Sequence, residues 1–139
     1  MSSGNPYYVG LQNVGSYQVA GIPFATASLT APATGSTALR ITFPSVTNWI
    51  HIGTKSSAHV RVGFSENGVH GTNYVIIHED NHPTHFVMNV KVSEIYLSSD
   101  NGTPVSDCYV MAGLTNIDTK LLELSGPSGS NWSGSLGVG

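Results

Sequence analysis

Hydrophobic and polar residues alternate along the middle of the chain. In the clearest case Leu39, Ile41 and Phe43 fall on one face, and Arg40 and Thr42 fall on the other. A period of two residues indicates a half-buried β-strand. This alternation, or a β-branched run, predicts strands at Ser16–Ala20, Ala38–Phe43, Val46–Ile52, Ala58–Phe64, Tyr74–His78, His85–Val92, Ile95–Leu97 and Val105–Leu114.

Helical periodicity is nearly absent, because Gly, Pro, Asn and Ser interrupt the chain too often. The best helix candidate is Asp118–Leu124, whose spacing also suits a strand or an irregular segment. Turn residues such as Asn67-Gly68 separate the predicted strands, and Ala25–Thr37 is predicted to be a surface loop. Many short strands with frequent turns predict an all-β domain, an antiparallel sandwich or barrel.

The composition is poor in charge. Charged residues make up 9% of the 139 positions, against about 25% in an ordinary soluble domain. Ser, Thr, Asn and Gly together fill 56 positions, and the net charge is −3 with five basic residues. Such a chain lacks the cations that nucleic-acid binding requires. A neutral surface instead favours association with other proteins, and we expect the few charges to lie beside turns, in solvent.

No apolar run approaches the roughly 20 residues that span a bilayer, so no membrane association is expected. The segment Met1–Gly10 lacks a basic region followed by an apolar one and does not resemble a signal peptide. Cys108, the single cysteine, cannot form an internal disulfide. Its apolar surroundings predict a buried, unreactive thiol.

The chain divides into a predicted β-sandwich domain, residues 1–124, and a glycine- and serine-rich C-terminal arm, residues 125–139. The arm could dock on its own sandwich, dock on a neighbouring subunit, or close its own domain as an edge segment. Apolar residues of the arm and two tyrosines outside the predicted strands are the candidate subunit contacts: Tyr7, Tyr8, Trp132, Leu136 and Val138.

Three of the six histidines, His78, His82 and His85, lie close together in the sequence and are weak candidates for metal ligands. Their spacing matches no metal motif, and Pro83 excludes a helix that would bring them to one face. A hairpin would place His78 and His85 opposite each other as a cross-strand pair without ligation. We therefore expect surface or interface histidines and no cofactor.

No catalytic constellation stands out. The chain has no nucleophile elbow between a strand and a helix and no phosphate-binding loop. Half of its eight acidic residues are scattered next to predicted turns, which favours turn-forming and solubilising roles over paired catalytic carboxylates: Glu66, Asp80, Asp100 and Asp118. The sequence therefore predicts a protein that is not an enzyme.

One set of segments resembles small β-sandwich capsid decoration and minor capsid proteins of tailed phages and large double-stranded DNA viruses. The resemblance covers about Arg40 to Leu114 and is carried by Trp49–Ile52, Val60–Val69, Gly71–Tyr74 and Val90–Leu97. The tail Asn131–Gly139 has the character of a virion protein arm. The resemblance implies a jelly-roll-like fold and a structural role on the capsid surface. Its partners would be the major capsid protein and further copies of this chain, in a trimer or pentamer.

Two other functions stay open. Surface aromatics and the loop around His82 could form a glycan-binding platform, as in a carbohydrate-binding module or adhesin head. For Trp49, Tyr74 and Tyr96, however, we favour a place in the core or in an interface over a role in such a platform. A metal-dependent, cupin-like enzyme is the third interpretation.

Overall fold

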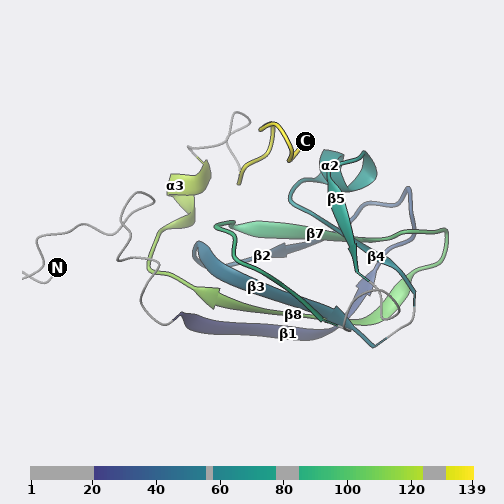
Figure 1. The fold of residues 1–139 in the computed structure, drawn as a ribbon, viewed down its shortest axis with the longest axis horizontal. Helices are drawn as coiled ribbons and strands as arrows, with labels where there is room; N and C mark the ends of the chain where they lie inside the picture. Colours follow the sequence, from purple (N-terminus) through teal and green to yellow (C-terminus); the bar gives the residue numbers. More distant parts are fainter. Residues whose placement is uncertain (1–20, 56–57, 78–84, 124–130) are drawn as a thin grey trace, which may run out of the picture.

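The computed structural model describes residues 21–55, 58–77, 85–123 and 131–139. These residues form two antiparallel four-stranded sheets that pack face to face (Figure 1). One sheet contains, in order, β1 (Ile22–Ala31), β8 (Val105–Leu114), β3 (Thr47–Thr54) and β6 (His85–Met88). The other contains β2 (Leu39–Thr42), β7 (Glu94–Ser99), β4 (Val60–Gly63) and β5 (Tyr74–Ile77). The predicted all-β sandwich is confirmed.

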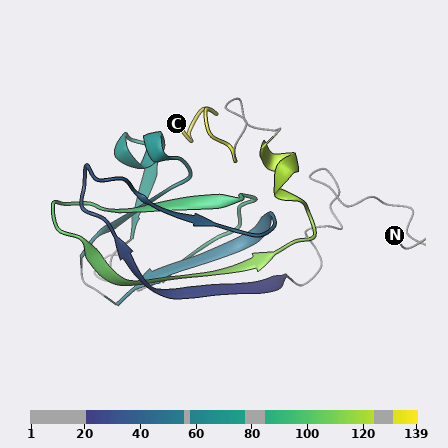
Figure 2. The ribbon, with the colours of Figure 1, turned by 180° about the vertical axis from the view of Figure 1, so that it is seen from behind.

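The strand pairing follows a simple rule. Within the sheets β1 pairs with β8, β2 with β7, β3 with β6, and β4 with β5, always antiparallel. Successive pairs alternate between the two sheets. Within the first sheet β3 also pairs with β8, and within the second β4 also pairs with β7, so that each sheet contains two joined pairs. The view from behind shows the same two layers (Figure 2). Among the described strands, the first four therefore pair with the last four in reverse order.

The core lies between the sheets and is formed by the inward positions of each strand. β7 is buried along its whole length, because its inner face meets the opposite sheet and α2 packs against it. Phe24 and Phe43 meet edge to face with their centroids 5.2 Å apart. The largest fully buried side chains of this central core are Phe43, Ile50, Ile52, Ile95, Leu97, Val60, Val62 and Val105.

The strands predicted from alternation correspond to β2, β3, β4, β5, β7 and β8, and β6 covers the first part of the predicted strand at 85–92. The predicted loop at 25–37 is wrong for residues 25–31, which belong to β1, whereas residues 32–37 lie in the connection between β1 and β2. β1 is an edge strand with register shifts and a positive φ at Ser28, so its alternation is broken. The predicted strand at 16–20 lies outside the described residues.

Two short helices complete the described fold. α3 (Thr119–Glu123) forms within the helix candidate Asp118–Leu124. α2 (Glu66–His70) lies where the sequence predicts only a turn. Its N-cap Ser65 accepts a hydrogen bond from the Gly68 N–H at 2.9 Å, which satisfies one of the backbone donors of a helix start.

Candidate functional site

The last nine residues, 131–139, lie against the sandwich of their own chain. Asn131 is completely buried: its Oδ1 accepts from the Ser93 N–H at 2.8 Å, and its Nδ2 donates to the Phe64 carbonyl at 3.0 Å. Ser65 Oγ donates to the Val138 carbonyl at 2.8 Å, which ties the end of the chain to the start of α2. The described residues 131–139 therefore contact the sandwich of their own chain.

Trp132 joins the arm to the core. Its Nε1 donates to the Lys91 carbonyl at 2.5 Å, and the indole packs against both the central core and the small cluster of Val46, Ile117 and Leu122. Leu136 is fully exposed, and Val138 is half-buried. An intermolecular role for these three residues stays a prediction. Tyr7 and Tyr8 lie outside the described residues.

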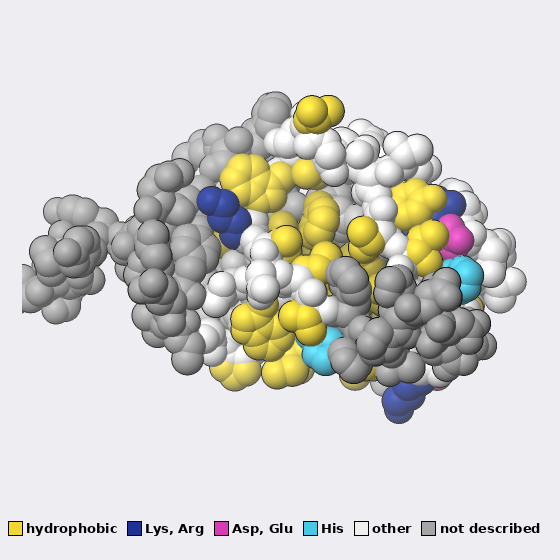
Figure 3. All heavy atoms as spheres, viewed as in Figure 1, with side chains coloured by type: hydrophobic (Ala, Val, Ile, Leu, Met, Phe, Trp, Pro, Cys, Tyr) yellow, Lys and Arg dark blue, Asp and Glu magenta, His cyan; other side chains and the backbone are white. Residues whose placement is uncertain are grey.

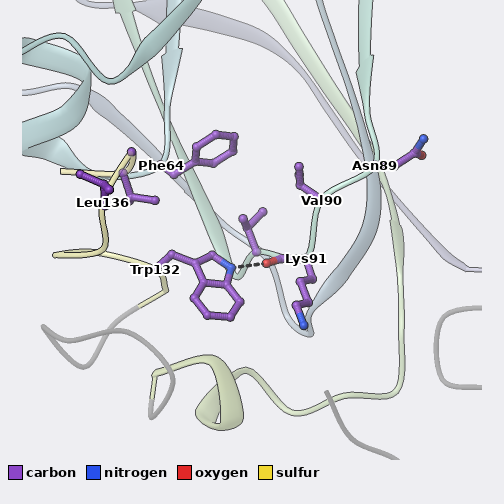
Figure 4. Close-up of a pocket in the computed structure, with 9 residues that line it drawn as sticks. Phe64, Asn89, Val90, Lys91, Trp132 and Leu136 are labelled. Carbon is purple, nitrogen blue, oxygen red and sulfur yellow. Dashed lines mark hydrogen bonds between the residues drawn. The ribbon is translucent and has the colours of Figure 1, made fainter. Parts of the chain in front are cut away.

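An open, mostly apolar hollow of about 420 Å³ lies beside this arm. Figure 4 shows Phe64, Val90, Trp132 and Leu136 around it, with the hydrogen bond from Trp132 to the Lys91 carbonyl drawn as a dashed line. In the space-filling view hydrophobic side chains gather in the hollowed middle of this face (Figure 3). The arm thus forms one wall of a surface depression.

The outer side of the β1-β8-β3-β6 sheet carries a second feature, which we call the outer apolar face. Its central row crosses all four strands through the paired positions Ala25, Met111, His51 and Val87. Val87 is 54% exposed and Met111 is 41% exposed. These positions alternate with the inward-facing core residues, so they point away from the core.

Two further rows flank this central row. One row contains Pro23, Gly113 and Trp49, and the other contains Tyr109, Gly53 and His85. A Cβ on Gly113 would lie 2.3 Å from Trp49 Nε1, so the indole lies directly over that glycine. The His51 and Tyr109 rings meet edge to face at 6.0 Å. None of the described residues in the three rows is Asp, Glu, Lys or Arg.

Charged side chains gather on the opposite sheet. Arg40 Nη2 lies 2.8 Å from Glu94 Oε1, and Arg61 Nε lies 2.7 Å from Asp100 Oδ1. The Arg61 guanidinium also covers the Tyr74 ring at 4.4 Å. Glu94 is only 3% exposed, so the expectation that the charges lie in solvent beside turns is wrong for this carboxylate. Glu94 lies in a β-strand beside Arg40 and Tyr96. A charged side chain can be buried when an opposite charge and a hydrogen-bond donor compensate for the lost water, and these two residues supply both.

Tyr96 gives this cluster a measurable pH dependence. Burial, the hydrogen bond that Tyr96 donates to Glu94 and the charge of that carboxylate raise the pKa of Tyr96 well above its usual value. The unfolded chain therefore loses this proton first, and the stability due to the protonated hydroxyl is present below pH ~10 and declines above it by about 1.4 kcal/mol per pH unit.

We expect the stability advantage of the wild type over Tyr96→Phe to shrink as the pH rises above about 10. Urea unfolding of both proteins across this range measures it. The comparison removes the contribution of other titrating groups, which both proteins share. Parallel stability curves would contradict the assignment.

Neither a metal site nor a reactive thiol emerges from the described residues. No group of three or more His, Cys, Asp or Glu side chains is placed to hold a metal ion in residues 21–55, 58–77, 85–123 and 131–139. His78 and His82 lie outside these ranges, and of His85 the structure describes only the backbone, paired with Gly53. Cys108 is buried, and burial raises the pKa of its thiol.

The sequence alone identified Trp132 as an anchor but missed Asn131, Met111 and Val87. Each of the latter two is an unremarkable β-strand residue, and only the pairing register brings them into one row with His51. The sequence signal for Asn131 was its position just before Trp132. In the structure its backbone has a positive φ of 50°, a conformation that Asn adopts more readily than most residues.

Within the described part of the chain, no helix has the length and apolar character needed to cross a membrane. Comparison with models of known protein families and with curated proteins finds no match to this chain.

Proposed function

We propose that this protein is a virion structural component, a capsid decoration or minor capsid protein that binds the major capsid protein and copies of itself. The outer apolar face is the observation that carries this proposal. It is a sheet surface with exposed Met111 and Val87, half-buried aromatic rings and no charged side chain among its described rows. Protein interfaces have this composition at their centres: aromatic residues and Met are enriched there and most charged residues are depleted.

The strand pairing supports a jelly-roll fold as part of the proposal. An eight-stranded jelly roll is an antiparallel ribbon wrapped into two sheets, with first strand beside last and the inner strands nested accordingly. The pairs β1–β8, β2–β7, β3–β6 and β4–β5 follow this scheme. Jelly rolls occur in viral capsid proteins, lectins and cupins, so the fold agrees with the proposed role but does not by itself select it.

The alternative is a carbohydrate-binding or adhesin-type sandwich. The half-buried rings of Trp49, His51 and Tyr109 on the outer apolar face are the observation in its favour, because sugars stack on exposed aromatic surfaces. Against it, the neighbouring exposed side chains Met111 and Val87 offer no hydroxyl or carboxylate to a sugar.

Introducing a charge into the outer apolar face should weaken capsid binding. Met111→Glu buries a carboxylate wherever this face meets a neighbour, and we expect at least a tenfold lower affinity for shells of the major capsid protein, about 1.4 kcal/mol. Co-sedimentation with purified shells measures the occupancy.

Ser106→Glu is the matched control, because Ser106 is also an exposed residue of β8 but lies outside the three rows. It should leave shell occupancy unchanged. Equal occupancy of the Met111→Glu variant and the wild type would overturn the proposed docking face. Binding to a glycan array together with no shell binding by the wild type would favour the alternative.

A further inference from the structure

The chain contains two Asn-Gly pairs, Asn67-Gly68 and Asn101-Gly102. An Asn-Gly pair can modify itself, because glycine has no Cβ to keep its backbone nitrogen from approaching the side-chain amide of the preceding asparagine. The rate depends on whether the folded protein leaves that nitrogen able to move and how it orients the amide. The two pairs differ in both respects.

The first pair lies in α2, where its backbone is held. The Gly68 N–H donates to Ser65 Oγ at 2.9 Å, and Gly68 is buried. The Asn67 carbonyl accepts from the Gly71 N–H at 2.9 Å, which closes the helical turn. A buried nitrogen whose hydrogen is bonded in this way reaches the neighbouring amide only after local unfolding. The fold therefore protects Asn67, although the residue itself is exposed.

The second pair lies in the turn between β7 and β8. Asn101, Gly102 and Thr103 are all exposed, and a Cβ on Gly102 would meet no described atom within 4 Å. Within the described part of the chain, no hydrogen bond engages the Gly102 N–H. This nitrogen is therefore open to solvent and can turn toward the Asn101 side chain without breaking a hydrogen bond.

Two hydrogen-bond donors orient the Asn101 amide. Its Oδ1 accepts from the Thr103 N–H at 2.9 Å and from the Ser99 hydroxyl at 3.2 Å. Negative charge develops on this oxygen when a nitrogen adds to the amide carbon, and donors aimed at such an oxygen stabilise that charge. The Asn101 N–H also donates to Ser99 Oγ at 3.2 Å, which holds the residue beside the same hydroxyl. The turn thus places a polarised amide next to the Gly102 nitrogen.

We propose that Asn101 is a site of spontaneous deamidation and that the fold protects Asn67 from the same reaction. The Gly102 nitrogen bonds to Asn101 Cγ, the bond from Cγ to Nδ2 breaks, and ammonia leaves with the proton of the Gly102 N–H. The succinimide ring that results takes up one water at either of its two carbonyls. Ring opening gives aspartate or isoaspartate, and each product carries one new ionised carboxyl group at neutral pH. The modification does not depend on the proposed function.

The isoaspartate product changes a turn that is tied to the connection between β1 and β2. The Asn101 carbonyl accepts from the Thr34 N–H at 2.8 Å, and Thr34 Oγ1 donates to the Ser99 carbonyl at 2.8 Å. In isoaspartate the main chain runs through the former side chain, so the link between β7 and β8 gains one methylene. We therefore expect amide hydrogen exchange at Thr34 to accelerate at least tenfold in the isoaspartate form.

Incubation of the full chain at mildly alkaline pH, followed by peptide mapping, tests the proposal. Each deamidation adds about one dalton to the peptide that contains it. We expect Asn101 to be converted at least tenfold faster than Asn67 in the folded protein. In urea that unfolds the domain, the two rates should lie within about threefold of each other, because neither nitrogen is then held.

Gly102→Ala tests the attacking nitrogen. The added methyl group has room in the turn but hinders the approach of the nitrogen to the Asn101 amide, so the conversion should slow at least tenfold. Unchanged conversion in this variant would contradict the proposed step. Equal rates at Asn67 and Asn101 in the folded wild type would overturn the proposal. So would a difference that persists in urea, because the fold would not be its cause. None of these measurements involves capsid shells, so they leave the test of the proposed function separate.

Discussion

Replacing Asn131 with Ala should lower the free energy of unfolding by about 3 kcal/mol. The change removes the acceptor of the Ser93 N–H and the donor to the Phe64 carbonyl, and both groups are left without these partners in a buried site. Each unsatisfied buried group costs roughly 1–3 kcal/mol. The positive φ of 50° at this position adds strain for Ala, because Asn tolerates the left-handed region better. Urea unfolding followed by tryptophan fluorescence measures the change.

Two further variants separate these causes. Asn131→Gly loses the same hydrogen bonds but accepts the positive φ, so it should be less destabilised than Asn131→Ala by about 1 kcal/mol. Leu136→Ala alters a fully exposed residue of the same segment and should change stability by less than about 0.5 kcal/mol. A loss below about 1 kcal/mol for Asn131→Ala would show that the arm contributes little to the folded domain.

Replacing Gly68 with Ala should detach the end of the chain from α2 and cost about 2 kcal/mol. A Cβ at this position would lie 2.1 Å from the Val138 carbonyl oxygen and 2.9 Å from Ser65 Oγ. The carbonyl belongs to the backbone and cannot rotate away as a side chain can. The hydrogen bond from Ser65 to Val138 should therefore break, although Ala alone would favour the helix. Amide hydrogen exchange at Val138 and Gly139 should accelerate at least tenfold.

Gly102→Ala is the control for this substitution. A Cβ on Gly102 has no neighbour within 4 Å, and the residue lies in an exposed turn. Its stability and exchange rates should match those of the wild type. If Gly68→Ala also behaved like the wild type, the contact between α2 and the C-terminal residues would not persist in solution.

The sandwich could be predicted because its central strands alternate clearly. Ile50 and Ile52 of β3 and Val60 and Val62 of β4 each show the period of two that a half-buried strand imposes. β1 was not predicted because an edge strand needs few large side chains. The register shifts around Ser28 also interrupt its alternation. α2 was not predicted because a helix of five residues shows too little periodicity to be distinguished from a turn.

The candidate sites were harder to predict for a different reason. The outer apolar face joins residues of four strands, and their order in the sheet depends on long-range pairing. No local pattern reveals that Met111 lies between Ala25 and His51. The anchors of the arm, Trp132 above all, could be predicted from their apolar character in a polar tail. Their docking partner could not, because the tail contains no information about which surface has a matching hollow.

The pairing of the first strand with the last sets the timing of folding. Ile22 and Leu114 are neighbours in the sheet although about 90 residues separate them in the chain. Loops of this length close slowly, and domains built from such distant contacts fold in milliseconds to seconds rather than microseconds. Synthesis proceeds at about 5–20 residues per second, and β1 lacks β8, its pairing partner among the described strands, until β8 has left the ribosome. The outer apolar face of a newly made chain is therefore complete only after β8 has been synthesised and has paired with β1 and β3.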